Sequence, residues 1–229
     1  MEAVEWPRLT QSLDQSGVAV VKRLLPEPVT RQLAGLYEND SLFRSRVVMS
    51  RHGFGRGEYK YFGYPLPAEI SRLRGLLYPH LSLIANRWNE QLGDPVRFPA
   101  SHDRFLERCH AAGQCRPTPL LLQYAEGDYN CLHQDLYGEH VFPLQVTVLL
   151  SKPVEDFEGG ELVLTEQRPR MQSRAEVVPL QQGDAAIFAV HRRPVRGSRG
   201  IYRVNHRHGV SRIRRGARYT LGVIFHDAK

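Results

Sequence analysis

Two histidines and one aspartate have the types and the spacing of a metal site. His133 and Asp135 are separated by one residue, and His208 follows 73 residues after Asp135. Alternate residues of a strand point to the same side, so a strand through this segment would turn His133 and Asp135 toward one ion. Two imidazoles and one carboxylate on one face of an Fe(II) ion leave the opposite positions open for other ligands. The pattern predicts a mononuclear iron site with these three residues as its metal ligands.

A second histidine, His206, competes for the third ligand position, because alternation along a strand would turn both His206 and His208 inward. Arg218 lies ten residues after His208, a spacing that suits two adjacent antiparallel strands joined by a basic turn over residues 212–216. A guanidinium there could bind a carboxylate through two parallel hydrogen bonds. Ten residues after His206 is Gly216, which has no side chain to offer. We therefore expect His208 to be the ligand, and His206 to lie beside the ligands, on the substrate side, or simply within a strand.

Together, His133-x-Asp135, His208 and Arg218 resemble the pattern of the 2-oxoglutarate- and Fe(II)-dependent dioxygenase superfamily, over roughly residues 118–227. The run Tyr124-Ala-Glu-Gly127 is similar to AlkB-type nucleic-acid demethylases. The run Gly159-Gly-Glu-Leu162 resembles the prolyl hydroxylases instead. The whole chain is also similar to a group of bacterial 2OG-Fe(II) oxygenases that has been linked, by analogy, to the oxidative repair of damaged DNA.

This resemblance implies an enzyme that uses Fe(II), O2 and 2-oxoglutarate, for which ascorbate could serve as a reductant. Such an enzyme would hydroxylate a substrate C–H bond, or oxidatively remove a methyl group, and would release succinate and carbon dioxide. The resemblance also implies that Arg218 binds the distal carboxylate of 2-oxoglutarate, with Thr220 and Tyr124 as hydroxyl donors. The alternatives are that Tyr124 is a packed aromatic residue and Thr220 an ordinary strand residue.

The charge distribution bears on the substrate. The chain has a net charge of +7, and residues 185–226 contain ten arginines and no acidic residue. Such a segment favours contact with a polyanion, so a damaged or methylated nucleic acid is one candidate substrate. Solvated turns or partners of carboxylates elsewhere in the fold explain the arginines equally well. AlkB-type proteins carry a second arginine and an asparagine where this chain has Ile224 and Leu122, which counts against base repair.

Three other functions remain open. A protein hydroxylase of the prolyl type is favoured by the Gly-Gly-Glu-Leu run, and a small-molecule hydroxylase would use the same metal ligands. A basic binding module without catalysis is the least favoured, because all three metal ligands are present.

Short strands separated by turn residues dominate the chain after residue 118. The candidates are residues 120–124, 144–150, 161–165, 175–179, 185–190, 207–211 and 219–225. This pattern predicts a mainly β fold with helical support (α+β), namely a double-stranded β-helix, that is, a cupin-like jelly roll with N-terminal helices. Before it, we expect a strand over residues 17–22, a helix over 26–37, and a helix over 67–92 that is kinked or split at Pro79.

We expect one compact domain, in which residues 1–117 form a helical and strand support and residues 118–229 form the catalytic core. Within the support, residues 51–61 contain three glycines and predict a loop. This loop is either a mobile flap that carries Arg51, Arg56, Tyr59 and Tyr61 over the active site, or an ordinary surface connection.

The remaining features indicate a cytoplasmic protein that does not bind membranes. Its three cysteines lack a paired spacing, its first residues lack the pattern of an export signal, and it has no apolar run near the roughly 20 residues needed to cross a bilayer. One cysteine, Cys131, lies two residues before His133, and we expect it to line the site without binding the metal.

Overall fold

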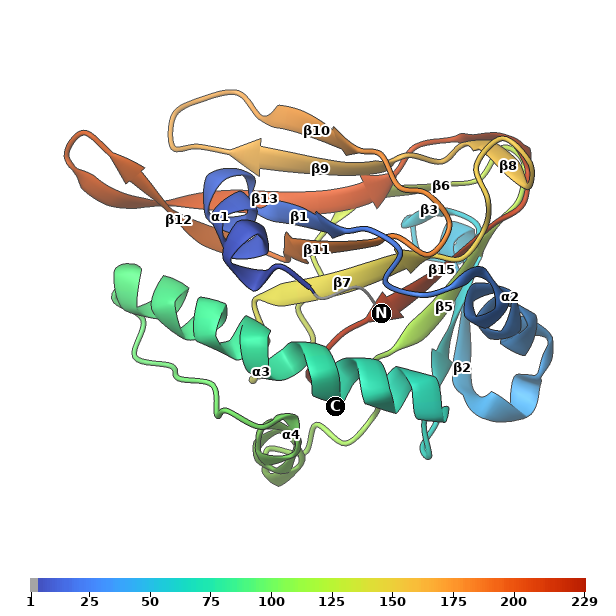
Figure 1. Ribbon diagram of the computed structural model, residues 1–229, viewed down its shortest axis with the longest axis horizontal. Coiled ribbons are helices and arrows are strands. Elements are labelled where there is room, and N and C mark those ends of the chain that lie inside the picture. Colours follow the sequence, from blue (N-terminus) through green and yellow to red (C-terminus); the bar gives the residue numbers. More distant parts are fainter. Residues whose placement is uncertain (1–3) are drawn as a thin grey trace.

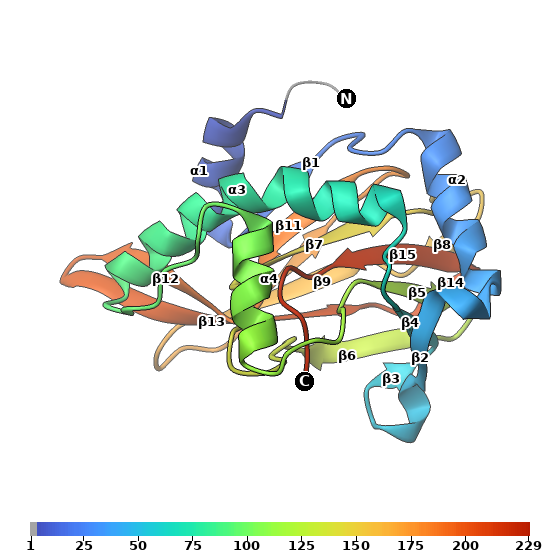
Figure 2. The ribbon, with the colours of Figure 1, turned by 90° about the horizontal axis from the view of Figure 1, so that it is seen from below.

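Two antiparallel sheets stacked face to face form the body of the protein, and a long helix covers the outer face of the larger sheet (Figures 1 and 2). The computed structural model describes residues 4–229. No helix within these residues combines the length and the apolar character needed to cross a membrane.

The larger sheet has seven strands in the order β1-β11-β7-β15-β5-β4-β2. Their bounds are β1 Val18–Val21, β2 Phe43–Val48, β4 Glu58–Phe62, β5 Leu120–Tyr124, β7 Leu144–Leu149, β11 Ala185–Ala189 and β15 Arg218–Val223. Three of these strands come from the first 117 residues, so the N-terminal part of the chain extends the same sheet that the C-terminal part builds.

The smaller sheet has the order β10-β9-β13-β6-β3, and β12 also pairs with β13. Its strands are β3 Gly55–Arg56, β6 Tyr129–His133, β9 Leu162–Gln167, β10 Arg174–Val178, β12 Arg192–Gly197 and β13 Gly200–Val210. A separate two-stranded sheet joins β8 Phe157–Gly159 to β14 Ile213–Gly216.

Four α-helices and three short 3-10 helices complete the described chain. The α-helices are α1 Trp6–Ser16, α2 Glu27–Gly35, α3 Ala68–Gln91 and α4 His102–Ala111. The 3-10 helices are η1 Leu36–Glu38, η2 Asp40–Leu42 and η3 Met49–Arg51.

The central strands of the larger sheet are buried on both faces, which explains their continuous apolar sequences. All six residues of β7 are buried. One face, with Val146 and Val148, packs with α3 residues such as Leu77 and Leu81 in the main hydrophobic core. The space between the sheets holds a second core that includes Leu149, Leu164 and Phe188. A strand covered on both sides cannot show the polar and apolar alternation of a half-exposed strand.

The predicted mainly β jelly roll with N-terminal helices is confirmed, and each strand predicted after residue 118 overlaps an observed strand. Of the two alternatives predicted at Pro79, a split into two helices is wrong, because α3 runs through this proline as one helix. Pro79 and Gly75, four residues before it, both lie on the exposed face of the helix. Water can therefore bind the carbonyl group that the proline leaves without a helical partner.

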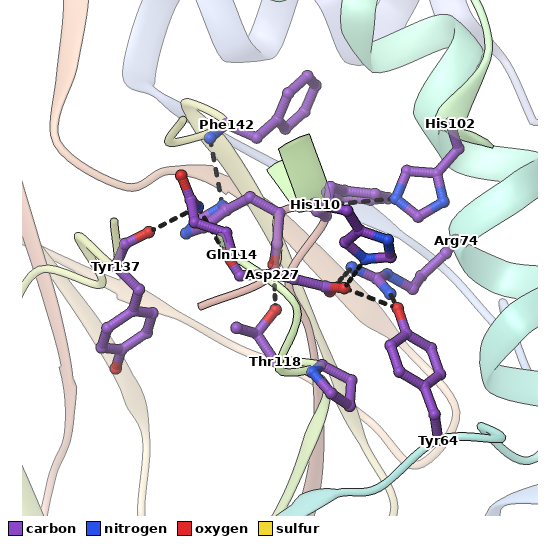
Figure 3. A network of polar contacts seen from close by, with 12 residues as sticks. Tyr64, Arg74, His102, His110, Gln114, Thr118, Tyr137, Phe142 and Asp227 are labelled. Carbon is purple, nitrogen blue, oxygen red and sulfur yellow. Dashed lines mark hydrogen bonds and ion pairs between the residues drawn. The ribbon is translucent and has the colours of Figure 1, made fainter. Parts of the chain in front are cut away.

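A buried carboxylate ties α3 and α4 to the C-terminal end of the chain. Figure 3 shows Arg74, Tyr64 and His110 converging on Asp227. Nη2 of Arg74 lies 3.0 Å from Oδ1 of Asp227, Tyr64 donates to Oδ2 at 2.8 Å, and Nε2 of His110 lies 2.9 Å from Oδ2. Burial alone would raise the pKa of Asp227, but the charge of Arg74 and these hydrogen bonds lower it below the ordinary value. Asp227 is therefore held as an anion that neutralises a buried guanidinium.

We expect Asp227→Asn to reduce the free energy of unfolding by about 3–5 kcal/mol, because it leaves Arg74 buried without a counter-charge. Glu107→Gln is the control, since it removes a carboxylate that pairs with Arg104 at 2.9 Å on the exposed side of α4. That change should cost about 0–1 kcal/mol. Denaturant unfolding measures both, and equal costs for the two variants would contradict the stabilising role of Asp227.

Candidate functional site

The two predicted histidine ligands lie opposite each other on neighbouring strands. His208 of β13 is paired in register with His133 of β6. Directly opposite residues of an antiparallel pair point to the same face, and the ring centroids of the two imidazoles are 4.2 Å apart. Both side chains line the space between the two sheets. The backbone pairing therefore brings together two residues that are 75 positions apart in the sequence.

Asp135 reaches the same point from beyond the end of β6. The strand ends at His133, so the expectation that one strand carries both His133 and Asp135 is wrong. Oδ1 of Asp135 nevertheless lies 3.6 Å from Nε2 of His133, and Oδ2 lies 3.3 Å from Nε2 of His208. One donor atom from each of the three residues lies within 4.8 Å of the other two.

This donor set fits a first-row divalent metal ion. Nitrogen and oxygen ligands lie about 2.1 Å from such an ion, so two neighbouring ligands are about 3 Å apart. Nδ1 of His133 contacts the carbonyl oxygen of Cys131 at 2.8 Å, which leaves Nε2 with a free lone pair toward Asp135. Burial and the neighbouring imidazole of His208 lower the pKa of His133 and favour the neutral form that binds metals.

Asp135 is kept ionised in spite of its burial. Desolvation would raise the pKa of its carboxyl group, but the interactions with His208 and His133 and a hydrogen bond from Tyr137 hold this pKa far below the ordinary value. The hydroxyl group of Tyr137 donates to Oδ1 at 2.7 Å, and the hydroxyl group of Tyr61 donates to that of Tyr137 at 3.1 Å. Burial and the charge of Asp135 raise the pKa of Tyr137, so it remains a donor.

The loop that carries Asp135 and Tyr137 is held by the fully buried amide of Gln114. Its Oε1 accepts from the backbone N–H groups of Glu139 and His140 at 2.9 and 2.7 Å, and its Nε2 donates to the carbonyl oxygen of Tyr137 at 3.2 Å. Gly138 makes this close approach feasible, since a Cβ atom at its φ of +85° would lie 2.4 Å from Cδ of Gln114. The loop is thus positioned by the interior and not by strand pairing.

A cavity of about 340 Å³ lies between the sheets at this cluster. The structure brings all six of the predicted site residues to its walls: Tyr124, His133, Asp135, His208, Arg218 and Thr220. The histidines belong to the smaller sheet, whereas Tyr124, Arg218 and Thr220 belong to β5 and β15 of the larger sheet. The two groups therefore face each other across the cavity.

Arg218 is a buried cation with no carboxylate within 4.0 Å in residues 4–229, although the more distant charge of Glu161 acts on it. Its Nη1 donates to Oγ1 of Thr220 at 2.5 Å, and its Nε has no hydrogen-bond partner. Burial lowers the pKa of Arg218 to about 10, so the guanidinium remains charged near neutral pH. Tyr124 lies directly opposite on β5, and the guanidinium carbon is 5.7 Å from its ring centroid. An unpaired cation inside a protein is costly, and this wall of the cavity suits a carboxylate.

The predicted route from His208 to Arg218 is wrong. These residues do not lie on adjacent strands joined by a turn, because β13 and β15 belong to different sheets. Residues 213–216 of the expected turn form β14, which pairs with β8. The nine intervening residues cross from one sheet to the other, so the two side chains meet from opposite walls.

The segment 51–61 is not the single loop that its glycines predicted. Residues 58–61 belong to β4, between β5 and β2, so Tyr59 and Tyr61 line the cavity from a fixed wall. Gly53 and Phe54 reach the cavity from the part before β4, and Phe54 is 47% exposed. Arg51 and Arg56 are exposed. A covering role for residues 51–57 stays a prediction.

The two residues whose roles the sequence left open lie in different places. His206 is buried, and its Nε2 accepts from Nε of Arg193 at 3.0 Å, while Glu166 lies 3.9 Å away. Burial and the charge of Arg193 lower the pKa of His206 to about 4. Arg193 in turn donates to the carbonyl oxygen of Asp14 at the end of α1, so His206 belongs to a buried network of the fold. Cys131 lines the cavity, as expected.

Sequence reasoning missed Tyr137 and Gln114. Tyr137 lies two residues after Asp135, but the strand ends at His133, so only its closeness in sequence to the proposed ligands could have indicated it. Gln114 had no such signal, because its contacts with the loop depend on tertiary packing across more than 20 residues.

The chain matches a protein family described as an oxygenase that catalyses oxidative methylation of damaged DNA, over residues 57–228. An uncharacterized protein of Mycobacterium tuberculosis is 53% identical over 167 residues, which are 73% of this chain and 72% of that protein.

Two solved structures show the same fold at low sequence identity. A prolyl hydroxylase from Trichoplax adhaerens, in complex with a hypoxia inducible factor peptide, has a TM-score of 0.59 at 15% identity and covers 97% of this chain and 89% of its own. An oxidoreductase of the 2OG-Fe(II) oxygenase family from Burkholderia pseudomallei has a TM-score of 0.53 at 15% identity, with coverage of 100% and 94%.

We expect Tyr137→Phe to weaken the binding of a divalent metal by about 10- to 100-fold, because groups that orient a ligating carboxylate typically contribute that much to metal affinity. Calorimetric titration of the metal-free protein with Co(II) measures this directly. Tyr129→Phe is the control, since Tyr129 is partly exposed on β6 and makes no hydrogen bond through its hydroxyl group within the described residues. Unchanged Co(II) affinity in Tyr137→Phe would show that Asp135 needs no such support.

Proposed function

The chain belongs to this oxygenase family, within the 2-oxoglutarate- and Fe(II)-dependent superfamily, and we propose that His133, Asp135 and His208 bind its Fe(II) ion while Arg218 binds 2-oxoglutarate. Thr220 and Tyr124 are the proposed hydroxyl partners of the co-substrate. The substrate in this proposal is a damaged or methylated base of a nucleic acid.

One observation carries the assignment of the co-substrate. Arg218 is buried and charged, has no carboxylate within 4.0 Å in residues 4–229, and shares a cavity with the three candidate metal ligands. 2-Oxoglutarate carries a carboxylate at each end. A molecule that approaches the metal at one end can therefore offer its other carboxylate to the guanidinium, which restores the charge balance that the fold lacks.

The bound Fe(II) ion and 2-oxoglutarate would supply the oxidation of a substrate C–H bond by O2, with release of succinate and carbon dioxide. The chain itself contributes binding and orientation. Arg218 and Thr220 fix one end of the co-substrate, Tyr137 orients the carboxylate of Asp135, and the apolar walls, including Leu162 and Phe188, limit access of water. A methyl group on nitrogen that is hydroxylated at such a site is lost as formaldehyde, so one site can hydroxylate or demethylate.

Two features support a nucleic-acid substrate. The family description names damaged DNA, and the chain is basic, with a net charge of +7. The cavity of about 340 Å³ must hold the co-substrate together with the reacting group, so only one small group of a large molecule can enter it. A base that is rotated out of its strand satisfies this limit.

A comparison of three substrate pools tests this proposal. Succinate release from 2-oxoglutarate should rise with methylated oligonucleotides and not with pools of proline-containing peptides or with a metabolite extract. Stimulation by the peptides alone would establish the protein hydroxylase instead, and stimulation by the extract alone would establish a small-molecule hydroxylase.

We expect two substitutions in the cavity to have separable effects. His208→Ala should abolish succinate release and weaken Co(II) binding, because it removes a proposed metal ligand. Arg218→Ala should leave Co(II) binding intact and raise the dissociation constant of 2-oxoglutarate by about 10- to 100-fold, the range expected when hydrogen bonds to a charged group are removed. Calorimetry on the Mn(II)-loaded protein measures the second effect.

Arg215→Ala is the matched control, because Arg215 is exposed on β14 and pairs with Glu158 at 2.9 Å. Succinate release that survives His208→Ala would exclude His208 as a ligand. An unchanged 2-oxoglutarate affinity in Arg218→Ala would exclude Arg218 from the co-substrate site.

A further inference from the structure

The ten arginines of residues 185–226 fall into three groups that the sequence alone does not separate. Arg193 and Arg218 are buried. Arg214 and Arg215 pair with glutamates on the neighbouring turns, at 3.7 and 2.9 Å. Within residues 4–229 the other six are exposed and have no carboxylate within 4.0 Å: Arg192, Arg196, Arg199, Arg203, Arg207 and Arg212. The unpaired positive charge thus gathers mainly on β12, on β13 and at the turn between them.

Strand register places four of these arginines on one face of the hairpin. Arg192 lies opposite Asn205, and Arg196 lies opposite Ile201. Opposite residues point to the same face, and so do alternate residues of one strand. Arg192, Arg196, Arg203 and Arg207 therefore share the outer face of the smaller sheet, while Val204 and His206 point into the molecule, where both are buried. We name this set of four the arginine ladder.

No acidic side chain shares this face along the paired part of the sheet within the described residues. Arg207 lies opposite Thr165 of β9, Asn205 lies opposite Gln167, and Thr165 lies opposite Ala175 of β10. The glutamates of β9 and β10 have the opposite orientation: Glu166 is buried with Arg193, and Glu176 is paired with the inward-facing Leu164. Nε of Arg192 donates to Nε2 of His191 at 3.2 Å. None of the four guanidinium groups is neutralised by a carboxylate within the described residues, so their charge is available to an external anion.

The arginine ladder begins beside the cavity. Arg207 directly precedes the proposed ligand His208, and strand alternation turns one outward and the other inward. Leu132 and Gln134 line the cavity next to β13, where Nε2 of Gln134 donates to the carbonyl oxygen of His206 at 2.6 Å. From Arg207 the ladder runs toward the tip of the β12–β13 hairpin, which projects from the body of the molecule (Figure 1). At about 3.3 Å per residue, Arg203 lies about 13 Å from Arg207.

Repeated exposed guanidinium groups on an extended face match the regular charges of a phosphodiester backbone. We propose that the arginine ladder binds phosphates of the nucleic-acid strand whose base enters the cavity. This inference rests on the proposed function and assigns the strand-binding surface to the outer face of β12 and β13, in place of the whole basic segment. The paired Arg214 and Arg215 are outside this surface.

Fluorescence anisotropy of a labelled, methylated single-stranded oligonucleotide tests the proposal with matched variants. The double variant Arg203→Gln and Arg207→Gln should bind about tenfold or more weakly in 50 mM salt. Its slope of log affinity against log salt should be shallower by about 1.4, since each phosphate of a single strand that an arginine neutralises adds about 0.7 to the slope. The control Arg214→Gln and Arg215→Gln removes the same charge from an ion-paired position and should change neither quantity. Arg203→Lys and Arg207→Lys should restore most of the binding, because the interaction is electrostatic.

The experiment distinguishes a failure of the arginine ladder from a failure of the proposed function. If the unaltered protein binds the oligonucleotide but the two glutamine variants lose equal amounts of affinity, or none, the arginine ladder is wrong. The proposed substrate class would then still stand. Absence of oligonucleotide binding by the unaltered protein, with succinate release driven by peptides, would overturn the substrate class and the ladder together. Co(II) and 2-oxoglutarate affinities, which should be unchanged in every surface variant, establish that the cavity remains intact.

Discussion

The antiparallel pairing of β13 with β6 is the constraint on which the candidate site depends. It sets His208 opposite His133, so backbone pairing brings two of the three donor residues to the same face. The third donor comes from a loop, and a loop needs other support. Tyr137 and the buried amide of Gln114 provide it, and Gln114 also donates to the carbonyl oxygen of Asp227. The same side chain therefore joins the donor loop to the ion pair that anchors α3.

Opposite walls of the cavity carry opposite charges. Asp135 is an anion on one side, and Arg218 is a cation on the other, with no carboxylate within 4.0 Å in residues 4–229. Each charge is costly to bury alone. The fold keeps them in place before any ligand binds, so little reorganisation is needed when an anionic ligand arrives. A connection of only nine residues between His208 and Arg218 suffices, because the chain crosses directly between the sheets.

Local patterns identified much of this molecule from the sequence. The apolar runs at residues 120–124, 144–150 and 185–190 are strands because both faces of the larger sheet are covered. These local patterns did not show which strands pair with one another. Arg218 was assigned to the strand beside His208, since spacing cannot show that a chain changes sheets. The strand over residues 192–197 was missed because it contains Pro194 and three arginines, which are typical of an edge that is paired on one side only.

Because side chains alternate along β13, its register fixes the inward-facing and the outward-facing residues at the same time. His206 and His208 face the interior, and Arg203 and Arg207 face solvent, within one continuous strand. A shift of this strand by one position relative to β6 and β9 would exchange the two sets. An arginine would then replace the imidazole between the sheets, and a histidine would stand outside. Evolution can therefore substitute single side chains here, but an insertion or deletion within β13 would damage both faces at once.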